Sequence, residues 1–192
     1  MPTMRVSRIR AITASTLIGG VCLSGCSPEL NWREVHPADA DGLVALFPCK
    51  PEAAQRAMSW PEVNQATVHV LSCRSGDALW ALRYARLPDV RQVRSTLILW
   101  GQESGQLPGY QAQPAQTLQV PGMTPQPEAS AWKLASTPGP GPAGRPAHAM
   151  TWHFSHGLTV FQASVWRAAP FEVDPKGEDV MESFKNGLHF PS

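Results

Sequence analysis

Six histidines and several hydroxyl side chains are the residues of this chain whose types could support metal binding or nucleophilic catalysis. His153 and His156 lie three positions apart, and His69 lies on a separate strand-like segment. Residues three apart on a strand face opposite sides, and zinc needs three or four ligands, so these histidines are predicted to be surface or turn residues. No Gly-x-Ser-x-Gly elbow and no glycine-rich phosphate loop after a strand occurs. The sequence therefore predicts no catalytic residue, no metal and no cofactor.

The amino-terminal segment has the pattern of an export signal. Arg5, Arg8 and Arg10 precede an uncharged stretch over residues 11–23, which is the arrangement of a secretory signal. A membrane-spanning helix is the alternative interpretation, but the stretch is shorter than the ~20 residues that a bilayer core requires. We therefore expect residues 1–25 to be removed from the mature chain.

Leu23, Ser24, Gly25 and Cys26 close this segment. The run resembles the lipobox of bacterial lipoproteins, in which the bond before the cysteine is cleaved and the thiol carries a diacylglyceryl group. The resemblance implies that Cys26 is lipidated, and two or three acyl chains give a stable membrane anchor. Ser27, in place of an aspartate, implies the outer membrane, with the domain facing the periplasm. An ordinary soluble secreted protein is the alternative.

Two cysteines remain for other chemistry, because Cys22 leaves with the signal and Cys26 is expected to be acylated. Cys49 and Cys73 would then lie in an oxidising compartment, where a disulfide is the expected state. The bridge would close a loop of 24 residues and stabilise the fold by about 3 to 4 kcal/mol. A redox pair is the alternative, but no Cys-x-x-Cys motif is present.

Length and charge narrow the class of protein further. The 192 residues correspond to one domain, which we expect to comprise a tether over residues 26–41 and a folded part over residues 42–192. Loss of three arginines with the signal leaves 13 of the 16 basic residues against 15 acidic ones. A nucleic-acid partner is disfavoured, because it would require a basic stripe.

Hydrophobic periodicity predicts the elements that would position any site. Two hairpins are expected, one from residues 67–73 and 78–84 and the other from residues 147–154 and 158–167. Helices are expected over residues 89–102 and 177–186, where apolar residues recur at helical spacing.

The remaining segments give weaker signals. Further strands are expected over residues 43–47, 116–120 and 131–135. Residues 52–65 are undecided, with a helical turn over 52–58 as one interpretation. A proline- and glycine-rich loop is expected near residues 137–146.

The order of strands, helix, strands and terminal helix predicts an α+β fold, with two or three helices packed on one antiparallel sheet. The runs Leu30-Asn-Trp-Arg-Glu-Val35 and Gly42-Leu-Val-Ala-Leu-Phe-Pro-Cys-Lys-Pro51 resemble the start of the domain in uncharacterised proteobacterial lipoproteins. The element order is similar to the PsbP-type α+β fold. That resemblance implies no chemistry, since PsbP-type domains serve as assembly or accessory factors as well as binders.

Tryptophans are the remaining functional signal. Trp80, Trp100 and Trp152 fit core stripes, whereas Trp60 and Trp132 lie near loops and could line a cleft. The sequence therefore predicts a non-enzymatic, membrane-anchored lipoprotein with an accessory or protein-binding role, which binds or supports an envelope protein or complex through its sheet surface or its loop. A small-molecule or lipid binder with an aromatic-lined cleft is the alternative, and an enzyme comes third. An enclosed apolar pocket would favour a ligand, and a filled core with an exposed surface would favour a protein.

Overall fold

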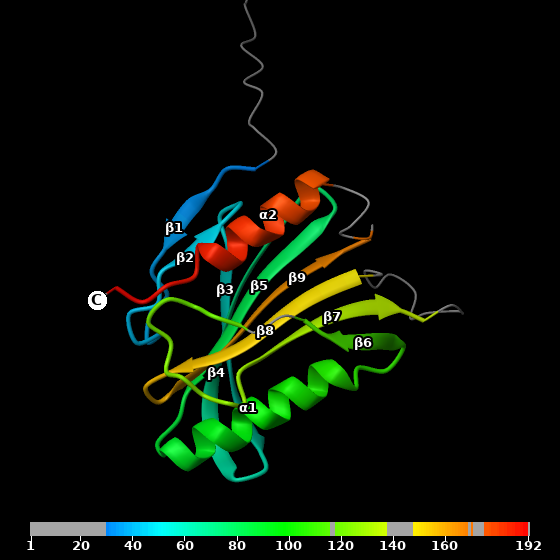
Figure 1. Cartoon of the computed structure of the whole chain (residues 1–192). Coiled ribbons are helices and arrows are strands. Elements are labelled where there is room, and N and C mark those ends of the chain that lie inside the picture. Colours follow the sequence, from blue (N-terminus) through cyan, green and yellow to red (C-terminus); the bar gives the residue numbers. More distant parts are fainter. Residues whose placement is uncertain (1–29, 116–117, 138–147, 169, 171–174, 192) are drawn as a thin grey trace, which may run out of the picture.

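The computed structural model describes residues 30–115, 118–137, 148–168, 170 and 175–191, with only the backbone for residues 175–179. It contains a seven-stranded sheet, a separate two-stranded sheet and two helices (Figure 1). The predicted signal, Cys26 and the predicted loop at 137–146, apart from residue 137, lie outside the described residues. None of the described helices is long and apolar enough to span a membrane.

The large sheet is antiparallel throughout, in the order β3-β4-β5-β9-β8-β7-β6. Its strands are β3 (Glu52–Trp60), β4 (Val63–Ser75), β5 (Ala78–Arg86), β6 (Tyr110–Pro114), β7 (Ser130–Ser136), β8 (His148–His156) and β9 (Thr159–Arg167). The helices are α1 (Val90–Gly105) and α2 (Pro175–Asn186), and the small sheet pairs β1 (Arg33–Val35) with β2 (Ala45–Phe47). The predicted α+β class, the two hairpins and both helices are confirmed.

One face of the large sheet packs against α2 and the small sheet, which lie together in Figure 1. Alternate residues of β5, namely Trp80, Leu82 and Tyr84, point to this side and are buried. Phe184 of α2 sits at the centre, with its ring centroid 5.3 Å from those of both Phe47 and Trp80. This cluster forms the larger part of the core, and burial of its aromatic side chains is its main source of stability.

The other face packs against α1. Asp89 caps the start of this helix by accepting a hydrogen bond from the Arg91 N–H. Val93, Leu97 and Trp100 are buried and form a second cluster with residues of β4 and β9. Because both faces of the central strands are covered, β8 is buried without interruption over residues 149–155.

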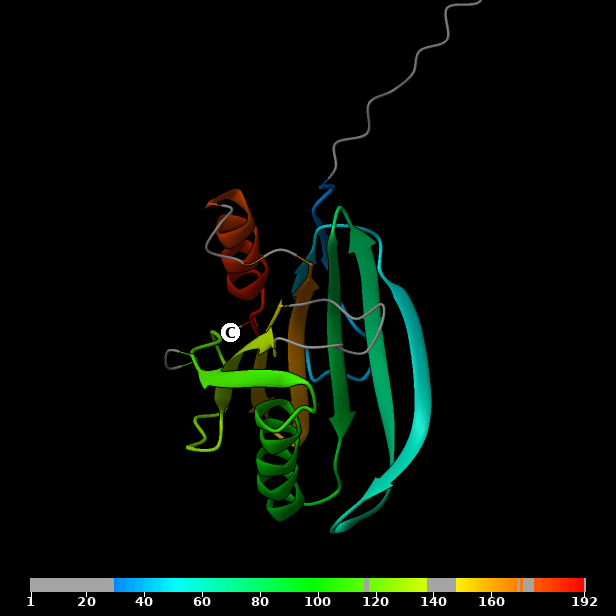
Figure 2. The same ribbon diagram turned by 90° about the vertical axis from the view of Figure 1, so that its right-hand side faces the viewer.

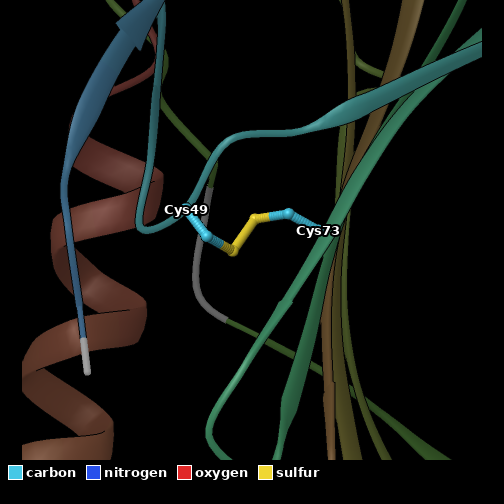
Figure 3. Close-up of a disulfide and its surroundings, with 2 residues drawn as sticks. All are labelled: Cys49 and Cys73. Carbon is cyan, nitrogen blue, oxygen red and sulfur yellow. A yellow bond between two sulfur atoms is a disulfide. The ribbon is translucent and has the colours of Figure 1, made fainter. Parts of the chain in front are cut away.

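The disulfide that the sequence predicts is present between Cys49 and Cys73 (Figure 3). Its S–S distance is 2.02 Å and its Cα–Cα distance is 6.0 Å. Cys49 follows β2 directly after Pro48, and Cys73 lies in β4, so the bridge fastens the small sheet to the large one. Among the described residues, these two sheets share no backbone ladder, so the bridge is a covalent connection between them.

Three sequence predictions are corrected. Residues 52–60 form the edge strand β3, and a helical turn is absent there, because pairing with β4 outweighs the helix propensity of Ala, Gln, Arg and Met. The predicted tether at 26–41 contains strand β1, which pairs with β2. The expected strand at 116–120 is not formed over its described residues 118–120, and the partner of β7 is β6.

Candidate functional site

A buried Ser–His cluster is the arrangement in the described structure that most resembles catalytic chemistry. His153 of β8 lies 3.1 Å from the Ser104 Oγ of α1 through Nε2 and 3.4 Å from the Ser130 Oγ of β7 through Nδ1. The Gln162 amide donates to the Ser104 Oγ at 3.2 Å. Burial, with a smaller contribution from the charge of Arg83, lowers the pKa of His153 to about 3.

The surroundings of this cluster favour a structural role. His153 is 0% exposed and Ser104 is 6% exposed, so both side chains are buried away from solvent. The imidazole is neutral near pH 7 and bridges a helix hydroxyl and a strand hydroxyl. The cluster therefore ties α1 to the sheet, and the sequence prediction of a surface or turn position for His153 is wrong. The alternating pattern of β8 predicts one buried face and one exposed face, and it does not show that α1 covers the face that carries His153.

The other histidines that could have joined a metal site lie elsewhere. His156 stacks on Phe190 with centroids 4.1 Å apart, and its Nδ1 lies 2.7 Å from the Gly122 carbonyl oxygen. His69 stacks on Tyr84 at 4.9 Å. Within the described part of the chain, no three His, Cys, Asp or Glu side chains are grouped in a way that could hold a metal ion.

An aromatic cleft lies between α1 and the first strands of the sheet. Trp60, at the end of β3, has its ring centroid 6.1 Å from that of Trp100, and its Nε1 donates to Thr96 Oγ1 at 2.9 Å. Met58, 42% exposed, stands at the rim. The full lining is Met58, Ser59, Trp60, Val68, Arg83, Leu99, Trp100 and Glu103.

Arg83 supplies the charge in this cleft. Its guanidinium lies 4.0 Å from the centroid of the Trp100 ring and pairs with Glu103 at 3.2 Å. Burial lowers the pKa of Arg83, partly offset by the charge of Glu103 and its hydrogen bond. The cation is thus already partnered by an aromatic face and a carboxylate. The cleft volume of about 90 Å³ is well below the ~300 Å³ at which small-molecule sites begin.

The second tryptophan that the sequence placed near a loop does not enter this cleft. Trp132 of β7 packs under α1, where a Cβ built on Gly105 would lie 3.2 Å from its ring. The absence of a side chain at Gly105 therefore lets the helix approach the strand. Trp60 and Trp132 belong to separate environments, so the predicted aromatic-lined site is not assembled from both.

An apolar groove of about 840 Å³ lies between the segment after β6 and the end of α2. It is lined by Leu118, Gln119, Val120, Pro121, Met123, Pro125, Gln126, Pro127 and Asn186. The lining contains no aromatic and no charged side chain, so nothing in it selects a particular ligand chemistry.

Strand β3 is the most exposed regular element of the described structure. Eight of its nine residues, from Glu52 to Ser59, are exposed, and no described strand pairs with its outer side. Figure 2 shows β3 (cyan) at the outer boundary of the sheet, beyond β4 and β5. A long unpaired edge of this kind presents free backbone N–H and C=O groups to another chain.

The sheet register shows which backbone groups of β3 are free. The Leu87 N–H, directly after β5, donates to the Leu158 carbonyl at 2.9 Å. Bonding sides alternate along a strand, so odd-numbered residues of β5 bond to β9 and even-numbered residues bond to β4. Tyr84 pairs with His69, and therefore even-numbered residues of β4 bond to β3.

The same alternation extends into the edge strand. Val70 of β4 pairs with Ala54 of β3, and the register is regular from Glu52 to Met58. The backbone N–H and C=O groups of Ala53, Gln55 and Ala57 therefore face outward, away from β4. Sequence reasoning missed this edge. Pro61 is the one local sequence signal for the turn between β3 and β4, and in the structure Glu62 of that turn has a φ of 68°.

Comparisons with known proteins bear on the fold. No protein-family model matches the chain, and no curated protein matches it. Among solved structures, the chain is similar to the solution structure of cyanobacterial PsbP (CyanoP) from Synechocystis sp. PCC 6803. That similarity has 10% sequence identity and a TM-score of 0.47, and it covers 87% of this chain and 96% of the other. It concerns overall fold alone, and no function follows from it.

Proposed function

We propose that this chain is a lipid-anchored, periplasm-facing lipoprotein of the outer membrane that has no enzymatic activity and binds an envelope protein by adding a strand to the β3 edge. Binding by strand addition uses the backbone of the edge for affinity and neighbouring side-chain environments for specificity. The observation that carries the proposal is the exposure of β3 from Glu52 to Ser59 with no described strand on its outer side.

The membrane part of the proposal is supported by sequence alone. Arg5, Arg8 and Arg10, the uncharged stretch after them and the Leu-Ser-Gly-Cys26 run have the order of a lipoprotein signal. A Cys49–Cys73 disulfide is consistent with an oxidising compartment such as the periplasm.

The binding part is supported by how the described interior is filled. The large aromatic side chains of the two clusters, including Trp80, Trp100, Trp152 and Phe184, are buried within them. The aromatic cleft is too small for a typical ligand, and it adjoins β3 at Met58 and Trp60. The groove beside α2 is large enough for a ligand, but it is open and contains no aromatic or charged side chain that would orient one. The unpaired β3 edge therefore supports a macromolecular partner more strongly than either hollow supports a small molecule.

The nine residues of β3 span about 30 Å at the usual rise per residue. The outward groups of Ala53, Gln55 and Ala57 can form the hydrogen bonds of one added antiparallel strand. Side chains of that strand on the Met58 face would lie beside the aromatic cleft, which gives the site a means of selecting among partners.

Photo-crosslinking in native membranes tests the proposal. A photoreactive amino acid at Ala57 of the β3 edge is expected to yield a discrete product of higher mass. The same amino acid at Gln113, exposed on the opposite sheet edge β6, is the control and is expected to yield none.

A proline at the outward position separates strand addition from contact by chance. Gln55→Pro removes an N–H that β4 does not use, and proline is tolerated on strand edges. We expect this variant to lose the Ala57 product and Gln55→Ala, which keeps the N–H, to retain it. An intact Cys49–Cys73 bridge in both variants would verify folding. Equal products in all variants, or no product from Ala57, would contradict the proposal.

A further inference from the structure

We infer that the strand added to the β3 edge is β3 of a second copy of this chain, related to the first by a two-fold axis at Ala54. The inference rests on the proposed function, in which this edge is the binding surface. It follows from the order of charged and small side chains along β3. When two copies of this strand pair antiparallel in one particular alignment, opposite charges face each other and alanine faces alanine.

The two-fold axis at Ala54 pairs residues symmetrically about that position. Glu52 of one copy then lies opposite Arg56 of the other, and the symmetry repeats this pair on the far side of the axis. Ala54 faces Ala54, and Ala53 faces Gln55. Residues directly opposite in an antiparallel pair point to the same face, so both Glu–Arg pairs form on the face that carries Ala54.

Neighbouring registers lack this match. An axis at Ala53 places Lys50 opposite Arg56, which are like charges, and an axis at Gln55 places Glu52 opposite Met58. Opposite charges across a strand pair stabilise it and like charges destabilise it. In the isolated chain, neither Glu52 nor Arg56 forms an ion pair that the described structure records, and both are exposed.

The free backbone groups fit the same register. Ala53 and Gln55 both face outward and lie opposite each other in the pair, so their N–H and C=O groups can bond across the axis on both sides. Pro51 comes opposite Ala57, and because proline has no N–H, one bond is missing at each end. The hydrogen-bond ladder of this register is therefore weakened at Pro51 on both sides of the axis, and the choice of register rests on the charged pairs.

Charge variants with mutual rescue test the inference. Two full-length copies with different affinity tags are co-expressed, extracted in detergent, and the fraction of one copy recovered with the other is measured. Glu52→Arg and Arg56→Glu each turn both attractive pairs into repulsive ones, and each variant is expected to raise its own dimer dissociation constant roughly tenfold to hundredfold.

A mixture of the two variants restores both attractive pairs. The introduced arginine on one copy then faces the introduced glutamate on the other, and the unchanged Arg56 of the first copy faces the unchanged Glu52 of the second. We expect Glu52→Arg and Arg56→Glu copies to recover each other as well as wild-type copies do. Recovery that fails for wild-type copies, or that is the same in every combination, would overturn the inference. Because rescue requires two folded chains, misfolding cannot imitate it.

Disulfide trapping checks the axis itself. In a non-hydrogen-bonded pair, Ala54 Cα atoms would lie about 4.5 Å apart, within reach of a disulfide, so Ala54→Cys in oxidised membranes is expected to give a dimer of twice the chain mass. Ala57→Cys is the matched control, because its two copies would lie about 20 Å apart.

The outcomes separate this inference from the proposed function. A crosslinked product from Ala57 that contains a different protein would overturn self-pairing and leave strand addition standing. The absence of any product from Ala57 would overturn both. A dimer trapped equally well through Ala57→Cys would overturn the two-fold axis at Ala54.

Discussion

The buried imidazole of His153 makes the stability of this protein depend on pH in a specific window. The pKa of His153 is lowered from 6.5 to about 3, chiefly by burial. Below about pH 6.5 the unfolded chain takes up a proton that the folded chain does not, so the free energy of unfolding falls as pH falls. This contribution is complete above pH 6.5 and is lost progressively toward pH 3.

The magnitude follows from the two pKa values. From pH 7 to pH 5 the loss in the free energy of unfolding is about 2 kcal/mol, and from pH 7 to pH 4 it is about 3 kcal/mol, since each pH unit in the window corresponds to ~1.4 kcal/mol. Such a loss is a large part of the stability of a single domain.

The assay compares wild type with His153→Gln by urea unfolding, followed by tryptophan fluorescence at pH 7 and pH 5. Glutamine can still bond to Ser104 and Ser130 but does not titrate, so the pH-dependent loss should be about 2 kcal/mol smaller in the variant. His36→Gln, at an exposed position, is the control and should lose as much stability as wild type. Equal losses in wild type and His153→Gln would refute the reasoning.

Three further predictions concern the bridge, one glycine and the anchor. Replacing Cys49 and Cys73 by Ala should lower the free energy of unfolding by about 3 kcal/mol, measured in urea, because the bridge closes a loop of 24 residues; an unchanged midpoint would contradict its structural role. Gly187→Ala should destabilise by about 1 to 3 kcal/mol, because its Cβ would clash with the Cβ of Leu46; no change in midpoint would be the opposing result. Cys26→Ser should release the protein from membranes in fractionation, and retention without lipid mass would count against the anchor.

The central elements could be predicted from the sequence because their patterns are strong. The β4–β5 and β8–β9 hairpins alternate in hydrophobicity across short turns, and α1 has Val93, Leu97 and Trp100 at helical spacing. The Cys49–Cys73 bridge could be predicted because only two cysteines remain after the signal and the acylated cysteine are set aside, and an oxidising compartment favours a disulfide between them. Local signals were sufficient wherever a segment buries one regular face.

Peripheral strands could not be predicted in the same way. β3 buries almost nothing, and its Ala, Gln, Arg and Met residues favour a helix, so only its pairing with β4 defines it. β1 and β6 are short and largely exposed, and each is held in place by pairing with a strand further along the chain, β2 and β7 respectively. Val90 fits the apolar stripe of α1 but is 60% exposed at the helix start.

The candidate sites show the same division. The sequence places both Trp60 and Trp132 near loops, where they could line a cleft; Trp60 lines one, whereas Trp132 lies under α1. The burial of His153 depends on α1 crossing β8, which the sequence does not reveal. The free edge at β3 arises from strand order, a property of the whole sheet that no local pattern contains.

The most direct test of strand addition is amide hydrogen exchange at Ala53, Gln55 and Ala57 in the full-length protein in its native membranes. If another strand pairs with β3, the amides of Ala53 and Ala57 should exchange at least tenfold more slowly in the wild-type protein than in the Gln55→Pro variant. Position 55 has no amide proton in the variant, so it is followed in the wild type alone. Exchange at the same fast rate in both proteins would mean that the edge stays open and that β3 is not the binding surface.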